Sequence, residues 1–170
     1  MRFFLLFLFL MQCVLHSSNS KEIESHNFDS MSRIAMDKFK IEYINIRAIN
    51  KSINKYSKLY NIPKSLVYAV IERESSFNHK LISKSECVGL MQINYKVWKK
   101  ELNIPSVEYL HNIENNIKCG CYILNKYFKM TGDYGLALQR YFGLSKKAHK
   151  YSISVLKIQE RYLGDKNESN

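Results

Sequence analysis

Apolar residues recur at helical spacing from about residue 31 onward, and polar breaks divide this pattern into segments. The first segment ends at Tyr60 and predicts one or two helices. After a break, Pro63 suits the first turn of another helix, which is expected to run to about Ser75. A loop rich in serine and lysine follows through Glu86.

The second half of the chain continues the helical pattern. A long helix is expected from Asn115 or Asn116 until Gly132, which ends it. Two more helices are expected, over residues 134–141 and from about 147 to 163.

The same pattern defines the fold class and the organisation of the chain. No alternating apolar pattern persists beyond a few residues, so the sequence predicts an all-α fold with a small hairpin or irregular loop in residues 80–88. We expect a polar leader and a helix in residues 21–50, one domain over 51–163, and a polar tail over 164–170.

Residues 1–20 have the layout of an export signal. Arg2 precedes an apolar run over residues 3–15, and polar sequence with small residues follows. The run is shorter than the roughly 20 apolar residues that span a bilayer as a helix. We therefore expect cleavage after Ser20, export to the periplasm or cell wall, and no transmembrane anchor in the mature chain.

A lipid anchor is the alternative for this segment. Cys13 stands at the end of the apolar run, where a lipid could be attached. Gln12, however, is larger than the small residue normally found before such a cysteine. Anchoring through Cys13 is therefore the less favoured interpretation.

Three cysteines follow the leader: Cys87, Cys119 and Cys121. An odd count in an exported protein suggests one disulfide and one spare thiol. Cys119 and Cys121 would point to nearly opposite sides of one helix, so either of them, but not both, is expected to pair with Cys87. A metal site is the alternative, but the histidines show no ligand spacing to these cysteines, and we expect no metal.

One carboxylate continues an apolar helical stripe. Val67, Val70 and Ile71 lie on one face of the helix that begins near Pro63, and Glu74 is the next position on that face. Apolar neighbours disfavour the charged form of a carboxyl group, which raises its pKa and suits it to act as a general acid. The alternative is a glutamate paired with a basic residue at the edge of the domain.

The residues around Glu74 carry a recognisable motif. Its blocks are Glu74-Ser75-Ser76-Phe77-Asn78, then Ser83, then Gly89-Leu90-Met91-Gln92-Ile93. They closely resemble the signature of the soluble-type lytic transglycosylase family, which has Glu-Ser-x-Phe-Asn, a Ser nine residues after the Glu, and Gly-Leu-Met-Gln from fifteen residues after it. Two later blocks extend the resemblance over about residues 56–160: Asn116-Ile117-x-x-Gly120-x-Tyr122-x-Leu124 and Ala137-Leu138-x-x-Tyr141.

The resemblance implies a lysozyme-like helical fold with a long cleft for glycan. It implies that Glu74 protonates the oxygen between N-acetylmuramic acid and N-acetylglucosamine, and then accepts the proton of the muramyl 6-hydroxyl as a 1,6-anhydro ring closes. Because the nucleophile belongs to the substrate, no second carboxylate is required, whereas hydrolytic glycosidases usually need two.

The resemblance also implies roles for other residues. Ser83 would hydrogen-bond Glu74, Gln92 would contact sugar groups, Tyr141 would line the cleft, and Met91 would help to form its floor. Ordinary packing is the alternative for each, and it is strongest for Met91 because methionine so often fills gaps in a core. Nothing in the sequence implies a cofactor.

The sequence departs from the family pattern at three places. Glu86-Cys87 stands where the family usually has Gly-Ala, which adds a carboxylate near the cleft. After Tyr141, Phe142-Gly143 stands where the family usually has Asn-Ala-Gly. The asparagine amide that helps to hold substrate in the family is therefore missing, and stacking by Phe142 could replace it. The loop that follows is basic and suits either contact with peptide stems or simple solvation; it holds Lys146, Lys147, His149 and Lys150.

The charge of the chain agrees with this interpretation without deciding it. The sequence carries a formal net charge of +11, and loss of Arg2 with the leader leaves +10. Such a surface favours a polyanionic partner. An exported protein is not expected to meet nucleic acid, whereas peptidoglycan carries peptide carboxylates. The alternative is that the charge only keeps the protein soluble.

Two other functions stay open. A muramidase of the same fold would leave hydrated ends, with Glu86 assisting a water molecule. The second is a peptidoglycan-binding module without turnover that belongs to a wall-spanning apparatus, and the missing Asn after Tyr141 keeps this function open. For an enzyme, the small size of the chain suggests a local cutter that serves a secretion or conjugation apparatus. The complete Glu74 motif favours catalysis, because a binding module does not need a carboxylic acid in an apolar setting.

Overall fold

The computed structural model describes residues 28–164, and the fold over this range is all-α, as predicted. Its elements are α2 (Ser30–Phe39), α3 (Tyr43–Tyr60), α4 (Lys64–Ser75), β1 (Cys87–Val88), β2 (Ile93–Asn94), α5 (Tyr95–Trp98), the 3-10 helix η1 (Glu108–His111), α6 (Ile113–Thr131), α7 (Tyr134–Phe142) and α8 (Ala148–Gly164). The predicted export signal, Cys13 and residues 165–170 of the predicted tail lie outside the described residues. Over 28–164, no helix has both the length and the apolar character needed to cross a membrane.

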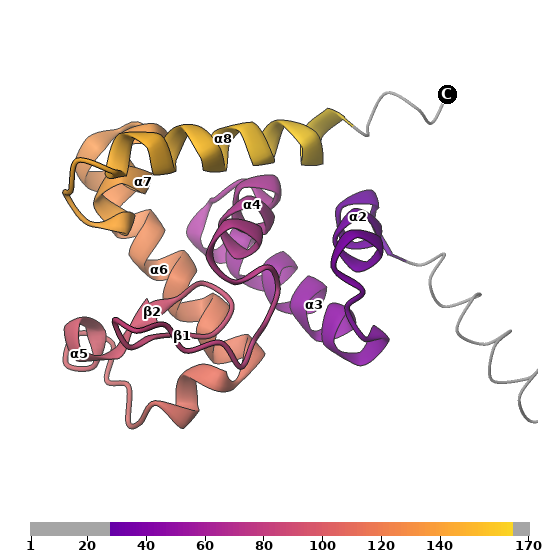
Figure 1. The fold of residues 1–170 in the computed structure, drawn as a ribbon, viewed down its shortest axis with the longest axis horizontal. Helices are drawn as coiled ribbons and strands as arrows, with labels where there is room; N and C mark the ends of the chain where they lie inside the picture. The colour runs from indigo at the N-terminus through magenta and orange to yellow at the C-terminus, as the bar shows by residue number, and fades with distance from the viewer. Residues whose placement is uncertain (1–27, 165–170) are drawn as a thin grey trace, which may run out of the picture.

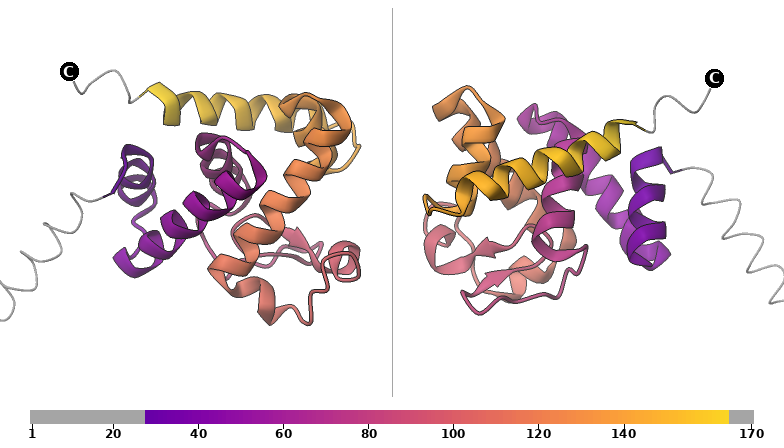
Figure 2. Two further views of the ribbon diagram at one scale, coloured as in Figure 1. Left: turned by 180° about the vertical axis from the view of Figure 1, so that it is seen from behind. Right: turned by 45° about the horizontal axis from the view of Figure 1, so that its top comes forward.

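Helix α4 is the centre of the domain. It packs against α8, which lies across it in Figure 1, and against α3 and α2. Every residue from Ser65 to Glu72 is buried, which fits a helix enclosed by neighbours on several sides. Helix α6 packs against α3 and α7, as the view from behind in Figure 2 also shows. The core therefore forms around α4 and α6.

The ends of α6 follow from its capping residues. The side chain of Asn112 accepts a hydrogen bond from the Asn115 N–H at 3.1 Å, so the helix begins at Ile113, slightly before the predicted start. Gly132 adopts a positive φ of 69° and ends the helix at the predicted position.

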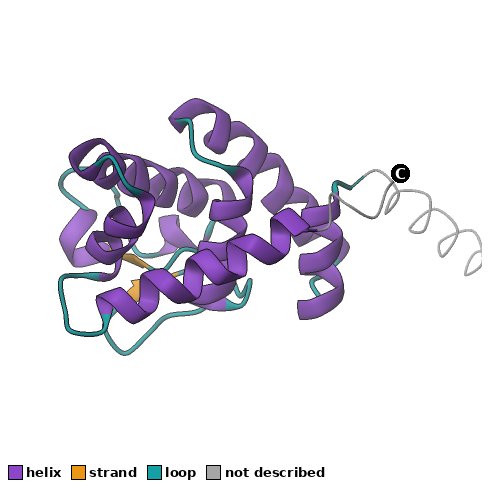
Figure 3. Ribbon diagram, turned by 90° about the horizontal axis from the view of Figure 1, so that it is seen from above, coloured by secondary structure: helices purple, strands orange, loops and turns teal. Residues whose placement is uncertain are grey.

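The hairpin lies later in the chain than predicted. Strands β1 and β2 pair antiparallel in the registers Cys87↔Asn94 and Val88↔Ile93, and only one isolated bridge, Ile82↔Val88, reaches into the loop expected to hold it. Figure 3 shows how small this sheet is beside the helices. The loop sequence is too polar to form two strands, so pairing uses the apolar residues that follow it.

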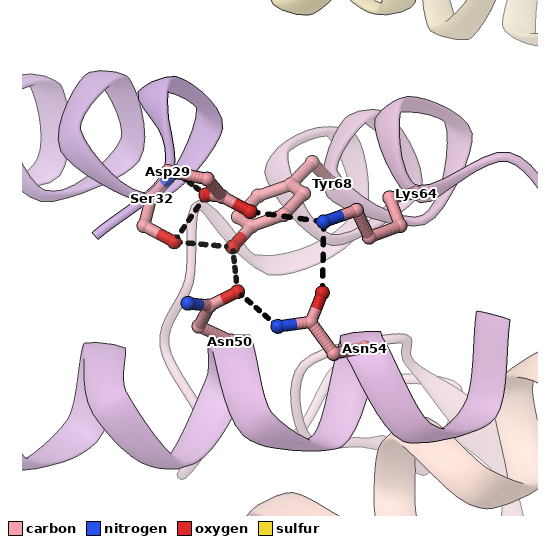
Figure 4. A network of polar contacts seen from close by, with 6 residues as sticks. All are labelled: Asp29, Ser32, Asn50, Asn54, Lys64 and Tyr68. Carbon is pink, nitrogen blue, oxygen red and sulfur yellow. Dashed lines mark hydrogen bonds and ion pairs between the residues drawn. The ribbon is translucent and has the colours of Figure 1, made fainter. Parts of the chain in front are cut away.

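A polar cluster joins α2 to α3 and α4 (Figure 4). Asp29 caps α2 by accepting the Ser32 N–H at 2.9 Å, and it also accepts a bond from the Lys64 ammonium at 3.1 Å. The hydroxyl groups of Ser32 and Tyr68 lie 2.8 Å apart, and Tyr68 donates to Asn50 at 3.3 Å. The segment before the predicted domain is thus attached to its core.

Glu72 forms a second connection between distant elements. Only 8% of this residue is exposed, and its carboxylate accepts bonds from Lys38 at 2.7 Å, from Tyr162 at 2.8 Å, and from Arg161. Burial alone would raise the pKa of Glu72, but these three donors outweigh it and lower the pKa. Glu72 therefore links α2, α4 and α8 in its charged form.

Replacing Glu72 with Gln should lower the free energy of unfolding by about 1–3 kcal/mol near neutral pH, because it removes hydrogen bonds to a charged group. The folded-state pKa is below the ordinary 4.5, so the contribution is complete above pH 4.5 and disappears as the pH falls through the folded-state pKa. Urea denaturation from neutral pH down to pH 3 measures it. Glu160→Gln is the control, since Glu160 is exposed on α8; an equal loss in both variants would contradict the role of Glu72.

Candidate active site

Glu74 lies in the last turn of α4, where the chain leaves the core. The helix ends at Ser76, which adopts a positive φ of 49°, and the next residue, Phe77, is buried. Glu74 itself is half-buried, and the Tyr151 hydroxyl of α8 donates a short hydrogen bond to its carboxylate. The catalytic candidate is therefore held between the central helix and the last one.

The environment of Glu74 favours its protonated form. Burial raises the pKa of Glu74, and the Tyr151 hydrogen bond and the charge of Arg73 offset only part of this rise. Glu74 thus keeps its proton to a higher pH than an ordinary glutamate. Glu72, two positions earlier, has three hydrogen-bond donors and a lowered pKa. The two carboxyl groups of one helix therefore differ in protonation: the charged form is favoured at Glu72 and the neutral form at Glu74.

One aromatic ring and one cation lie against Tyr151, the partner of Glu74. The ring of Phe142 stacks on that of Tyr151, with centroids 4.6 Å apart and planes at 22°. The Arg73 guanidinium lies 5.9 Å from the Tyr151 centroid. Phe142, which departs from the family motif, therefore packs on the residue that holds the candidate acid, while 42% of its surface remains exposed.

A groove of about 300 Å³ lies beside this pair and is lined by Phe142 and Tyr141 from α7. Burial and the nearby charge of Glu74 both raise the pKa of Tyr141, which indicates that the groove lies close to the carboxylate. Gln92 and Cys87 contribute from the hairpin, and Trp98 of α5 also lines the groove. Residues from the hairpin, from α5 and from α7 thus meet in one groove.

The turn from Gly89 to Gln92 supports the groove and is fixed from two sides. The buried Asn116 amide donates to the carbonyl groups of Val88 and Leu110 and accepts the Met91 N–H, each at 2.8 Å. From the other side, the Ser75 hydroxyl donates to the Leu90 carbonyl at 2.8 Å. A Cβ at Gly89 would lie 2.3 Å from the Asn116 Nδ2 atom, so the turn requires glycine there.

Gln92 and Tyr141 line the groove, where the resemblance implied they would lie. The Gln92 amide donates to the carbonyl groups of Gly89 at 3.0 Å and Leu81 at 3.3 Å, which fixes its orientation. The Tyr141 hydroxyl donates to the Met91 carbonyl at 2.8 Å. These bonds set the position of both side chains before any substrate binds.

Two other motif residues are placed differently from expectation. The Ser83 hydroxyl accepts the Cys87 N–H at 3.1 Å, so it orders the loop, and Tyr151 rather than Ser83 hydrogen-bonds Glu74. The Met91 side chain is fully buried, and a Cβ on Gly120 would approach its sulfur to 2.2 Å. Met91 therefore lies beneath the site and packs against α6 without direct access to the groove.

Tyr151 is the residue of the candidate site that the sequence analysis missed. Together with Val155, Ile158 and Tyr162, it forms an apolar pattern at helical spacing. Such a pattern indicates only a packed face of α8. Its hydroxyl reaches a carboxylate 77 positions earlier. The only available signal was a tyrosine, which needs a hydrogen-bond partner when buried, among apolar positions.

The expectation of a disulfide is wrong for the described chain, because Cys87, Cys119 and Cys121 are all free thiols. Cys119 and Cys121 are buried on α6, where burial raises the pKa of Cys119 to about 11, and Cys87 is half-buried at the groove. The role suggested for Glu86 is also disfavoured: its carboxylate is exposed and pairs with Lys96 at 2.7 Å.

This fold and site define a lysozyme-like helical domain with one half-buried glutamate beside a groove. The chain belongs to the transglycosylase SLT domain family, whose model matches residues 51–152. The lytic transglycosylase Slt from Pseudomonas aeruginosa, solved as an inactive mutant, superposes with a TM-score of 0.62 at 18% identity, over 95% of this chain and 35% of that one. At this identity, the likeness shows the fold.

Curated relatives match a shorter part of the chain. The membrane-bound lytic murein transglycosylase C of Yersinia pestis (strain Pestoides F) is 35% identical over 75 residues, and that of Serratia proteamaculans (strain 568) is 36% identical over 75 residues. Each match covers 40% of this chain and 21% of the relative. The chain therefore matches about a fifth of the length of these relatives.

Tyr151→Phe should raise the pKa of Glu74 further, because it removes the hydroxyl that stabilises the charged carboxylate and keeps the ring that stacks on Phe142. Carbon NMR of the labelled Glu74 carboxyl group over a pH series measures this. Tyr162→Phe is the matched control, since Tyr162 donates to Glu72 and not to Glu74. An unchanged or lower pKa of Glu74 in Tyr151→Phe would show that the bond does not stabilise the carboxylate.

Proposed function

We propose that this protein is a lytic transglycosylase that cleaves the bond between N-acetylmuramic acid and N-acetylglucosamine in peptidoglycan and leaves 1,6-anhydro-muramyl ends. The observation that carries the proposal is Glu74, a half-buried carboxyl group with a raised pKa beside a groove. Family membership and the two curated relatives support the same reaction class.

The pattern of carboxylates favours ring closure over hydrolysis. A hydrolytic glycosidase needs a second carboxylate near the first, to activate water or to act as nucleophile. Glu72 is occupied by Lys38 and Arg161, and Glu86 by Lys96. Neither of these two carboxylates is free to assist Glu74, and one carboxyl group suffices when the substrate supplies its own nucleophile.

The proposed reaction has two proton transfers through Glu74. First, the protonated carboxyl group gives its proton to the glycosidic oxygen as the bond from that oxygen to the muramyl C1 breaks, and N-acetylglucosamine leaves with a free 4-hydroxyl. Next, the carboxylate takes the proton of the muramyl 6-hydroxyl as its oxygen bonds to C1. Glu74 ends protonated again, and no water is consumed.

The neighbours of Glu74 serve opposite halves of this cycle. Burial favours the neutral acid that begins it, and the Tyr151 hydroxyl stabilises the carboxylate formed at mid-reaction. The Gln92 amide uses its N–H groups on backbone carbonyls, which leaves its oxygen to accept a hydrogen bond from a sugar hydroxyl. Tyr141, close to Glu74, would orient the substrate.

The cellular setting is part of the proposal and rests on the sequence. The layout of residues 1–20 supports export, and the positive charge suits an anionic wall polymer. We propose the periplasm or cell wall as the location, with peptidoglycan strands as the partner. We further propose that the enzyme serves a secretion or conjugation apparatus.

Mass spectrometry of the products tests the proposal. The protein incubated with purified peptidoglycan should release muropeptides one water lighter at the muramyl end than hydrolysis products, and Glu74→Gln should reduce their rate of release at least roughly 100-fold, the scale of general acid–base catalysis. Glu86→Gln, which changes an exposed carboxylate, is the control and should retain the activity.

Each other outcome points to a different function. Hydrated ends would make the protein a muramidase. Release that persists in Glu74→Gln would assign the acid elsewhere. Binding without release by either form would leave a peptidoglycan-binding module.

A further inference from the structure

Arg140 is the permanently charged side chain among the described residues that line the groove. It is half-buried on α7, directly before Tyr141. Within residues 28–164 no carboxylate forms an ion pair with it, since the paired acids are bound to lysines and to Arg161. Arg140 thus presents an uncommitted guanidinium beside the candidate site.

The neighbours of Arg140 on its own helix offer no acid. One turn earlier lie Leu136 and Ala137, and the residues that follow the end of α7 are Gly143 and Leu144, all without charge. Asp133 at the start of α7 is committed to capping, because it accepts the Leu136 N–H at 2.8 Å. The guanidinium therefore has its planar set of donors free for a ligand that carries a carboxylate.

The groove also has aromatic side chains that complement this charge. Trp98 and Tyr127 both line it and meet edge to face, with ring centroids 6.1 Å apart. The nearby Lys126 does not compete for an anion, because both oxygens of Glu101 accept bonds from its ammonium, at 2.7 and 2.6 Å. Two aromatic rings and one free guanidinium in the same groove suit a sugar ring that bears a carboxylate.

We propose that Arg140 is a specificity-determining residue that binds a carboxylate of the glycan strand. This inference rests on the proposed function, because it concerns the substrate of the same groove. The carboxylate is either the lactyl group of a muramyl residue without peptide or a carboxylate of the peptide stem. Both offer the same two oxygens to the guanidinium fork.

Binding assays on a form that cannot turn over would test this directly. In the Glu74→Gln background, calorimetry compares three ligands: peptidoglycan strands with peptides, the same strands after an amidase has removed the peptides, and chito-oligosaccharides of equal length, which have no carboxylate. Arg140→Gln should weaken binding of carboxylate-bearing strands about tenfold, the scale of one hydrogen-bonded charge at a half-exposed site. It should leave chito-oligosaccharide binding unchanged.

Two variants make the result specific. Arg140→Lys keeps the charge without the planar fork and should lose less affinity than Arg140→Gln. Lys157→Gln removes one positive charge from an exposed position on α8 and should change nothing. A loss that appears only with peptide-bearing strands assigns the stem carboxylate, because the lactyl group is an amide there. A loss that appears only with amidase-treated strands assigns the lactyl carboxylate, and a loss with both kinds shows that Arg140 binds either one. Circular dichroism confirms that the variants are folded.

The outcomes separate this inference from the proposed function. Equal weakening of charged and uncharged ligands, or unchanged affinity in Arg140→Gln, would overturn the role of Arg140 while leaving cleavage through Glu74 intact. A protein that releases no muropeptides but still loses affinity for carboxylate-bearing strands in Arg140→Gln would support the role of Arg140 and count against catalysis.

Discussion

The amide of Asn116 is the contact on which the candidate site depends. Only 1% of this residue is exposed, and its three hydrogen bonds hold the backbone of β1, η1 and the turn of the hairpin against α6. Because a buried polar group without a partner is costly, removing the amide would leave three backbone groups unsatisfied at once. The turn carries Gln92 directly, and it holds Tyr141 through the Met91 carbonyl. A single side chain outside the groove therefore sets the geometry within it.

The sequence predicted the elements that local chemistry controls. Pro63 and Gly132 mark real helix ends, and the stripe that contains Glu74 belongs to the central helix. The sequence did not predict contacts between residues that are far apart along the chain. Tyr151 at helical spacing is indistinguishable from packing, although it reaches across the domain to Glu74. The expected disulfide failed for the same reason, because a count of cysteines contains no distances between them.

Glu72 and Glu74 show why burial alone does not identify a catalytic acid. Burial pushes the pKa of each carboxyl group upward, and by exposed surface Glu72 is the more enclosed of the two. What separates them is the charge of their partners: Glu72 accepts bonds from two cations and a hydroxyl, and Glu74 accepts one bond from a neutral hydroxyl. One helix thus supplies a carboxylate that stays charged near neutral pH and, two residues later, a carboxyl group whose protonated form is favoured.

The position of Trp98 has a practical consequence. It is the only tryptophan in the sequence, and it lies in the wall of the groove, edge-on to Tyr127 and with the Lys126 ammonium 5.3 Å from its ring. Indole emission responds to the polarity and charge of its surroundings, and the core contributes no competing indole signal. The chain therefore carries its own optical reporter at the surface where a sugar would lie, so that occupancy of the groove can be followed in the unlabelled protein in real time.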